Sequence, residues 1–403
     1  MDYRLRTVDY LMPVLAIFTA LVLSSLFIII SDTKVLSAWG DFFVNPGAAL
    51  KMSGMSLARA YGALFEGSIG SPARMAQGVV TYLRTGDSQP LLQAFYPLSE
   101  SLVATVPYIF AGLAVALGFR CGLFNIGAEG QLFIGALTSV WVGYSIKGLP
   151  WIIHLPLALL AGALGGAIWG AIPGYLKART GAHEVINTIM MNYIAFRLSD
   201  YMLTGPMKRS GYNPVSPPIE RSAWLPKFFP DPLRFHAGFF LALAVAALVY
   251  VFLWKTTWGF EIRTVGANPH AARYAGISVT QNLVLAMALS GALAGLAGAN
   301  EVLGVNHFMA QAFSSGYGFD SIALALLGKS YPAGVVLASL LWGVLRAGAI
   351  RMQSRARIPV DIIGIMQAMV IVFVAAPAVV RWIYRIRVRE EVEEAVFTRG
   401  WGG

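Results

Sequence analysis

The chain alternates between long apolar runs and short polar interruptions over most of its length. A membrane-spanning helix needs about 20 consecutive apolar residues, and the pattern offers such runs at ten places. The fold class expected is an all-α integral membrane protein. The ten predicted spans lie near residues 10–30, 99–118, 125–145, 152–175, 184–203, 237–254, 279–300, 310–329, 331–350 and 359–381.

Two of the apolar regions are interrupted by polar and small residues. Glycine, asparagine, glutamate and glutamine break residues 119–131, whereas serine, glycine and aspartate break residues 314–320. The breaks fall in the third and eighth spans, so a division into five and five spans gives two halves of opposite topology. Broken helices at matching positions are typical of an inverted repeat, in which they meet near the substrate path. We therefore expect a five-plus-five inverted repeat.

The spans divide the chain into regions. The apolar run 10–30 follows Arg4 and Arg6 but is too long for the apolar region of a signal sequence, so residues 1–30 predict a retained N-terminal anchor. Residues 31–98 are expected to form amphipathic helices on the outer membrane face, with Trp39, Phe42 and Phe43 at the interface. Residues 99–383 form the predicted transmembrane core, and residues 384–403 a cytoplasmic tail.

The polar stretch 255–278 predicts a short helix outside the bilayer, between two apolar spans. Asn268 is a suitable N-cap, Pro269 suits the first helical position, and Gly276 suits a left-handed stop. The excess of Lys and Arg over Glu in this stretch favours the cytoplasmic side. Such a helix is a contact point for another protein, and an ordinary solvated loop is the alternative.

The positive charges give the same orientation only when long loops are left out. With both termini in the cytoplasm, Lys and Arg are equally frequent on the two sides in a raw count. The rule applies to short loops, and without residues 31–98 the cytoplasmic side is richer. Arg351, Arg355 and Arg357 are the main exceptions, because this topology places them outside.

Composition agrees with a membrane protein. Hydrophobic residues make up 57% of the chain and charged residues 12%, too few polar residues to cover a soluble globule. The single cysteine, Cys121, excludes an intrachain disulfide and a cysteine-rich metal site. A net charge of +10 is better explained by orientation and lipid than by nucleic acid, because no basic and aromatic patch stands apart from the spans.

No enzyme motif is present. The residues GKS at 328–330 lack the glycine that a phosphate-binding loop needs at position 323, where Ala323 stands. The five histidines are scattered without a metalloprotease pattern, and there is no nucleophile elbow. We expect no catalytic residue, no metal site and no cofactor.

Small residues recur at four-residue spacing in the fourth and seventh predicted spans. Such faces let helix backbones approach closely in lipid, so these two helices are expected to be central. The proline-rich outer loop 204–236 is expected to be extended, and it either contacts a soluble delivery protein or only connects spans. The glycines concerned are Gly162, Gly166, Gly170 and Gly174 in the fourth span, and Gly291 and Gly295 in the seventh.

Polar groups inside a membrane are costly unless they are paired or line a cavity. Carboxylates and amides of the broken segments offer hydrogen bonds to sugar hydroxyls, and neighbouring aromatic rings offer stacking to a base or sugar. The alternative is that these groups satisfy each other and cap the broken helices. The candidates are Phe124, Asn125, Glu129, Gln131, Tyr317, Phe319 and Asp320.

Three stretches together resemble the permeases of ABC importers, in the branch that carries nucleosides and simple sugars and is related to branched-chain amino-acid permeases. They are FRCGLFNIGAEGQLFIGA at 119–136, WGFEIRTVGANPHAARYAGIS at 258–278 and GYGFDSIALALLGKSYPAG at 316–334. The resemblance covers roughly residues 95–380. It also adds Asn187 and Asn192 to the substrate pathway, although their spacing puts them about 140° apart on a helix.

The resemblance implies a permease subunit in the cytoplasmic membrane of a prokaryote. Separate ATP-binding subunits would grip residues 263–276, a second permease of the same or a different chain would complete the pathway, and a lipoprotein or periplasmic protein would deliver the solute. It favours nucleosides over ribose-like sugars. The implied ATPase-coupling residues are Arg263, Gly266, Asn268, Pro269, Ala271, Arg273, Tyr274 and Gly276.

Other functions stay open at this point. The same architecture serves branched-chain amino acids. A self-sufficient secondary transporter or channel would instead use Glu129 or Asp320 as a proton or cation site, and inverted repeats occur there too. A structural membrane scaffold is a third alternative.

Overall fold

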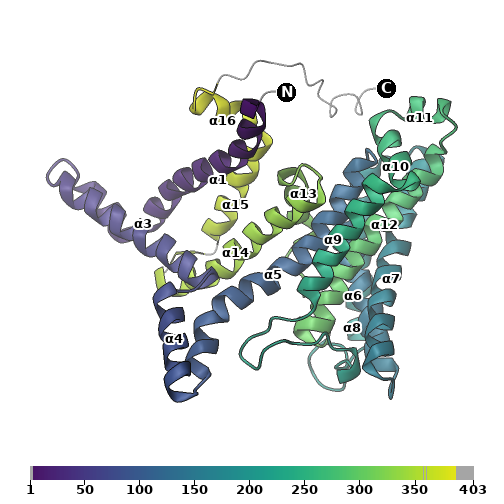
Figure 1. The fold of residues 1–403 in the computed structure, drawn as a ribbon, viewed down its shortest axis with the longest axis horizontal. Coiled ribbons are helices and arrows are strands. Elements are labelled where there is room, and N and C mark those ends of the chain that lie inside the picture. The colour runs from purple at the N-terminus through teal and green to yellow at the C-terminus, as the bar shows by residue number, and fades with distance from the viewer. Residues whose placement is uncertain (1–2, 357, 360, 387–403) are drawn as a thin grey trace. The chain divides into compact units, whose positions relative to one another are not determined.

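A computed structural model describes residues 3–356, 358–359 and 361–386 (Figure 1). The described part is helical, and only two isolated bridges of β type occur in it. The predicted tail 384–403 lies outside the described residues except for its first three. Two compact units make up the chain, and each is described by itself.

The first unit combines the N-terminal helices with the C-terminal ones. Its apolar core is formed by residues of α1, α3, α14 and α15, among them Ile28, Leu64 and Met366. Its elements are α1 (Tyr3–Ser31), α2 (Thr33–Gly40), α3 (Pro46–Ser68), α4 (Pro72–Thr85), the start of α5 (Gln89–Arg120), the end of α14 (Pro332–Ala356), α15 (Asp361–Ala375) and α16 (Pro377–Ile383).

The second unit contains the middle of the chain and is the larger one. Its elements are the rest of α5, α6 (Ala128–Ser145), α7 (Trp151–Thr180), α8 (Glu184–Thr204), the 3₁₀ turn η1 (Arg221–Ala223), α9 (Gly238–Lys255), α10 (Thr257–Ala267), α11 (Pro269–Tyr274), α12 (Val279–Asn300), the π-helical turn η2 (Glu301–Asn306), α13 (Tyr317–Leu327) and the start of α14.

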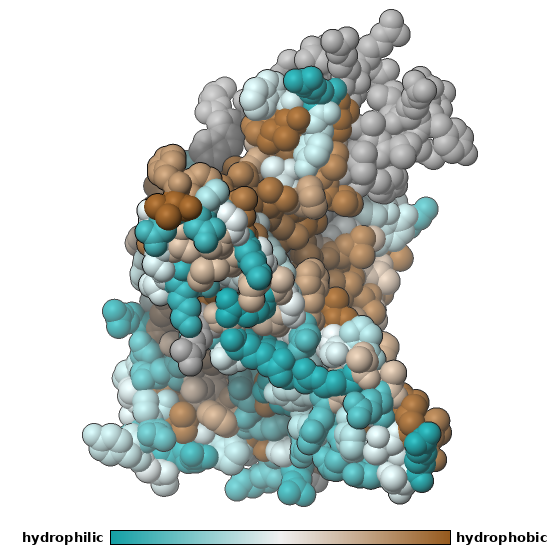
Figure 2. Space-filling model, turned by 90° about the vertical axis from the view of Figure 1, so that its left-hand side faces the viewer, coloured by the Kyte–Doolittle hydropathy of each residue, from teal (hydrophilic) through white to brown (hydrophobic). Residues whose placement is uncertain are grey.

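Six helices of the described part are long and apolar enough to cross a membrane, or seven if the bent pair α15 and α16 counts as one span. This supports the expected all-α membrane fold, and the face drawn in Figure 2 carries a brown apolar area above a mostly teal lower edge. The third and fifth predicted spans correspond to α6 and α8, which do not meet the test, and the eighth to α13, which has 11 residues. The six helices are Met12–Ser31, Gln89–Arg120, Trp151–Thr180, Gly238–Lys255, Val279–Asn306 and Pro332–Ala356.

Glycines let α7 and α12 pack backbone to backbone in the second unit. A Cβ atom added at Gly166 would overlap the carbonyl oxygen of Gly291, and one added at Gly295 would overlap that of Gly162. Helix α6 joins the same contact, since Gly135 faces Gly295. The expectation that the two glycine-rich helices are central is confirmed, because both pack against α6 as well as against each other.

Residues 205–230 and 234–237 form an extended strap over the ends of helices in the second unit. The backbone N–H of Leu225 donates to Leu303 at 3.0 Å, and that of Glu220 donates to Gly143 at 2.9 Å. The Trp224 ring stacks on His307 at 3.8 Å. Burial lowers the pKa of His307 to about 4, with Lys227 adding to the effect, so the imidazole under the strap is neutral near pH 7.

The region predicted to be amphipathic is helical from α2 to α4. Trp39 and Phe42 stack at 4.9 Å, and the neighbouring Phe43 is exposed. Asp32 caps α2, and its bond from the Ser56 hydroxyl lowers the pKa of that carboxyl. Helix α5 begins at Gln89, so the predicted start of the core at residue 99 falls inside one continuous helix.

We predict that Gly166→Leu lowers the amount of folded protein severely, because a side chain at this position must displace the backbone of α12. Expression in membranes and the melting temperature of the solubilised protein measure the effect. Gly62→Leu in α3 is the control, since an added Cβ meets nothing within 4 Å there. Normal yield and stability of Gly166→Leu would contradict the close-packing role.

Candidate functional site

The two irregular segments meet in the second unit. A carboxylate oxygen of Glu129, in the first turn of α6, accepts the N–H of Gly318 at 2.5 Å. A Cβ added at Gly318 would overlap the backbone of Glu129, so glycine is required for this approach. Gly316 begins α13 with a φ of +89°, which suits glycine. The expectation that the breaks lie together is confirmed.

Asn125 is held by a closed network of hydrogen bonds. Its amide nitrogen donates to Gln131 at 2.9 Å and to the Ser290 hydroxyl of α12 at 2.8 Å. Its amide oxygen accepts from the Gly127 N–H at 2.9 Å. Asn125 and Gln131 are both fully buried, so in this conformation their polar groups satisfy each other rather than face a solute.

Asn192 extends this network to α8. Its amide oxygen accepts the N–H of Gly130 at 2.8 Å, and its amide nitrogen donates to the carbonyl of Ile126 at 3.0 Å. These bonds satisfy backbone groups at the start of α6 that have no partner within the helix. Asn187 does not share this contact, as expected from the angle between the two residues. The interruption 121–127 is therefore fixed by side chains from α8 and α12.

The aromatic candidates lie in less buried positions. Tyr317 packs edge to face on Tyr108 of α5, with the ring centres 5.0 Å apart. The Tyr108 hydroxyl donates to Asp320 at 3.0 Å. Phe319 is 46% exposed, and Phe124 packs on Phe119 at 5.1 Å. Glu129 and Asp320 thus both belong to the place where the segments 119–131 and 314–320 meet, called the junction below, together with the Tyr108, Tyr317 and Phe319 rings.

The coupling segment 255–278 contains the expected short helix. The Asn268 side chain accepts the N–H groups of His270 and Ala271 at 2.9 and 3.1 Å, Pro269 takes the first position, and Gly276 has a φ of +78°. The helix α11 is anchored by the buried Ala272 and is otherwise exposed. This confirms the predicted capped helix and leaves its surface open to a partner.

A second helix, α10, was not predicted from the sequence. Thr256 caps it by accepting the Gly259 N–H at 3.1 Å. Its buried Ile262 and Val265 hold it against the second unit, whereas Trp258 and Phe260 stay exposed. The Glu261 carboxylate accepts from Asn282 of α12 at 3.0 Å. The coupling segment is thus two packed helices rather than one helix in a loop.

Gly266, at the end of α10, lies directly against the end of α5. A Cβ there would overlap the carbonyl oxygen of Arg120, and a Cβ added at Gly122, two residues later, would contact Gly266 at 3.4 Å. Arg120 also donates to the carbonyls of Ser330 and Lys329 at 3.0 and 3.1 Å, behind α13. The coupling segment is therefore in contact with the end of α5, and Arg120 in turn bonds the residues that follow α13.

Arg263 turns inward rather than toward a partner. Its guanidinium donates to the carbonyl of Leu253 at 2.9 Å and lies over the Trp254 ring, on which Arg120 also lies. By contrast Arg273 and Tyr274 are exposed, Tyr274 by 97%. The predicted coupling residues thus separate into an inward group that attaches the segment and an outward group.

Comparison with known proteins decides the family. Residues 98–375 match the family described as branched-chain amino acid transport system / permease component. The guanosine ABC transporter permease protein NupP of Bacillus subtilis is 42% identical over 337 residues, which cover 82% of this chain and 89% of that protein. The chain belongs to this permease family. The permease is a transport subunit without catalytic activity of its own, and such subunits work with ATPase and binding-protein partners.

Two further relatives are named for the transport of other solutes. The glucose ABC transporter permease protein TsgB13 of Haloferax volcanii is 39% identical over a stretch that covers 70% of this chain and 77% of TsgB13. The nucleoside ABC transporter permease protein NupB of Lactococcus lactis subsp. cremoris is 35% identical, with 70% and 80% covered. No solved structure matches the permease.

Some residues at the junction were missed from the sequence. Tyr108 and Ser290 stand singly in apolar runs, and only their position in the interior shows that they bond Asp320 and Asn125. The available signal was a single polar residue inside an apolar span. The pairing of Gly266 with Arg120 has no such signal, because it joins the ends of two helices, α10 and α5, that are far apart in the sequence.

We predict that Glu129→Gln reduces solute uptake by up to about tenfold, because a neutral amide replaces a charge-assisted bond to Gly318. Co-purification of the ATPase should be unchanged. Glu184→Gln is the control, since it removes a carboxylate from an ion pair with Lys177 away from the junction. Uptake kinetics equal to those of the unaltered permease would remove Glu129 from the site.

Proposed function

We propose that this permease imports nucleosides across the cytoplasmic membrane of a prokaryote, driven by a separate ATPase. The observation that supports the mechanism is the exposed helix α11, attached through Gly266 to the end of α5 beside the junction. Closure of the ATPase on ATP would push α11. The backbone contact at Gly266 would pass this motion to Arg120 and, through the bonds of Arg120, to the residues that follow α13.

Nucleosides are supported by the names of two relatives and by the junction. Guanosine and nucleoside permeases are 42% and 35% identical to the chain, although a glucose permease is 39% identical. A nucleoside offers a flat base and ribose hydroxyls, which suit the exposed Phe319, the partly buried Tyr317 and the Asp320 carboxylate. Simple sugars are the second candidate, supported by the glucose permease. Branched-chain amino acids, which the family description names, have no ring to stack.

The substrate pathway proposed from the sequence divides into two roles. Glu129, Asp320 and the aromatic residues Phe124, Tyr317 and Phe319 form the part that contacts solute when the junction opens. Asn125, Gln131 and Asn192 hold the interruption 121–127 in shape. Asn187, which precedes Asn192 on α8, takes no part in these bonds, and its place in the pathway rests on the resemblance to the family.

A ten-span inverted repeat remains our proposal for the topology. Helix α6 has 14 buried residues out of 18, so it can cross the bilayer inside the protein without an apolar lipid-facing side. Helix α8 has 21 residues, long enough to cross. The bond between Glu129 and Gly318 joins the start of α6 to the start of α13, as expected for matching broken helices of two halves.

A second, different permease subunit is part of the proposal. Bacillus subtilis has two proteins named as guanosine ABC transporter permeases, NupP and NupQ, and this chain is 42% identical to the first and 28% identical to the second. A chain that resembles one member more strongly fits one half of a heterodimer. A substrate-binding lipoprotein or periplasmic protein would deliver the solute at the outer face.

Uptake of radiolabelled guanosine, uridine, glucose and leucine tests the function. The permease is expressed with its ATPase, second permease and binding protein, and with an ATPase that cannot hydrolyse ATP. We expect nucleoside uptake that needs hydrolysis and resists a proton uncoupler. Uptake of glucose or leucine alone would overturn the nucleoside proposal.

We predict that Arg273→Glu abolishes uptake and weakens co-purification of the ATPase, because it reverses a charge on the exposed helix α11. The permease itself should fold normally, since Arg273 is exposed. Arg209→Glu makes the same charge change at an exposed position in the strap and should leave both readouts unchanged. Recovery of the ATPase with Arg273→Glu at the normal yield would count against α11 as the docking surface.

A further inference from the structure

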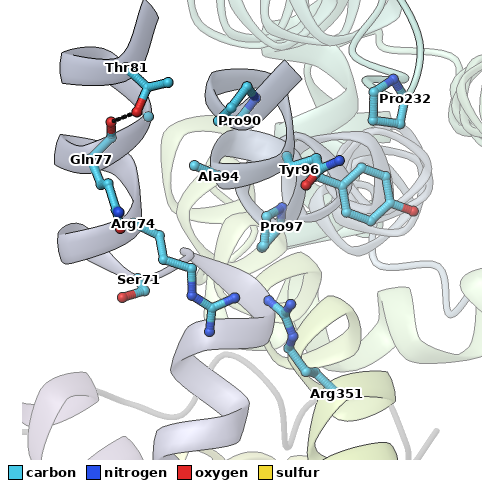
Figure 3. A pocket seen from close by; sticks show the side chains of 12 residues that line it. Ser71, Arg74, Gln77, Thr81, Pro90, Ala94, Tyr96, Pro97, Pro232 and Arg351 are labelled. Carbon is cyan, nitrogen blue, oxygen red and sulfur yellow. Dashed lines mark hydrogen bonds between the residues drawn. The ribbon is translucent and has the colours of Figure 1, made fainter. Parts of the chain in front are cut away.

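A cavity of about 740 Å³ lies within the first unit, between α4, the start of α5 and the end of α14. Its polar lining includes Gln77 and Thr81 of α4 and Gln93 of α5, and its only charged lining residues are Arg74 and Arg351. Figure 3 shows the two guanidinium groups pointing toward one another across the cavity. Two like charges that face each other across an open space form a site for an anion between them.

The charges around the cavity do not cancel. One carboxylate oxygen of Glu66 accepts from Arg74 at 2.9 Å and from Arg355 at 2.7 Å. Arg351 reaches only the backbone carbonyl of Glu66, at 2.9 Å. The guanidinium groups of Arg74 and Arg355 thus share one carboxylate, whereas Arg351 bonds a backbone carbonyl, so a further anion would offset positive charge at the cavity.

The position of the cavity favours a lipid as the source of the anion. The polar face of α4 lines the cavity, whereas Val79, Val80 and Leu83 project from its other side and are exposed, Leu83 by 76%. Exposed apolar side chains next to an anion site suit the boundary between acyl chains and headgroups. A site for a free anion in water would have no use for them.

Helix α14 also places the cavity at the boundary between acyl chains and headgroups. It is long and apolar enough to span a membrane, and Arg351 and Arg355 lie within its last six residues. Arginines at the end of a span extend to the headgroup level, where lipid phosphates lie. Arg351 and Arg355 were exceptions to the charge-based orientation, because the predicted topology puts this end of α14 outside. Binding of a lipid phosphate gives these arginines a role at that end.

The walls of the cavity are held by close backbone contacts. Gly78 brings α4 against the backbone of α5 at Pro90 and Leu91, and Gly67 brings α3 against Arg351 and Gly348 of α14. The two arginines are therefore presented by helices in fixed contact. A preorganised pair of guanidinium groups loses little freedom on binding.

We propose that this cavity binds the phosphate of an anionic phospholipid, with Arg74 and Arg351 as its ligands. A headgroup with no ammonium, such as that of phosphatidylglycerol, leaves the phosphate charge free for both guanidinium groups. Phosphatidylcholine carries its own cation and binds more weakly. The site is independent of the transported solute and of the ATPase contact.

Native mass spectrometry of the full-length permease tests the proposal. The detergent-solubilised protein is titrated with phosphatidylglycerol, phosphatidylcholine and inorganic phosphate in separate arms. We expect preferential binding of phosphatidylglycerol, weakened about tenfold by Arg351→Gln or by Arg74→Gln, since each removes a charged hydrogen-bond donor. Arg59→Gln is the control, because Arg59 bonds only a carbonyl of its own helix.

Several results would overturn the proposal. Equal affinity for the two lipids, or unchanged phosphatidylglycerol binding by both variants, would show that the cavity does not recognise a lipid phosphate. Arginine-dependent binding of inorganic phosphate without a lipid preference would assign the cavity to a soluble anion. Arg74 is 47% exposed, so Arg74→Gln keeps the test valid even if Arg351→Gln fails to fold.

Discussion

Close contact between backbones, made possible by glycine, is the constraint on which the second unit depends. In a bilayer the lipid tails are as apolar as leucine, so helices associate through packing and hydrogen bonds rather than through the hydrophobic effect. The glycines of α7 and α12 bring main-chain atoms together along both helices, and α6 closes on the same seam. This tight core can hold buried polar groups such as Asn125 and Gln131, because every one of their bonds is made inside it.

The same kind of contact connects the surface to the interior. Gly266 lies on the carbonyl of Arg120, and Gly318 lies on the backbone of Glu129. A contact between main chains has no flexible side chain to absorb a displacement, so α10 cannot shift without the end of α5. The guanidinium of Arg120 then leads on to Lys329 and Ser330, after α13. In the proposed mechanism these contacts would carry motion from the exposed α11 to the end of α5 and to the residues after α13.

The sequence predicts those features that depend on local chemistry. The caps of α11 follow from Asn268, Pro269 and Gly276 within nine residues, and the central place of α7 and α12 follows from glycine spacing. It cannot predict which side chains close the network around Asn125, because Ser290 lies 165 positions away. The helix α10 was missed because its polar residues resemble a loop. The division of candidate residues into structural and solute-facing ones likewise needs their partners, which only the fold supplies.

The most direct test of this account is the number of solute molecules imported per ATP hydrolysed by Gly266→Val in proteoliposomes with its partner subunits. Valine at this position must push α10 away from Arg120, so the account predicts continued ATP hydrolysis with little or no import. Ala267→Val, at the adjacent exposed position, should keep the normal ratio. A normal ratio for Gly266→Val in correctly folded protein would contradict the claim that this backbone contact transmits the motion.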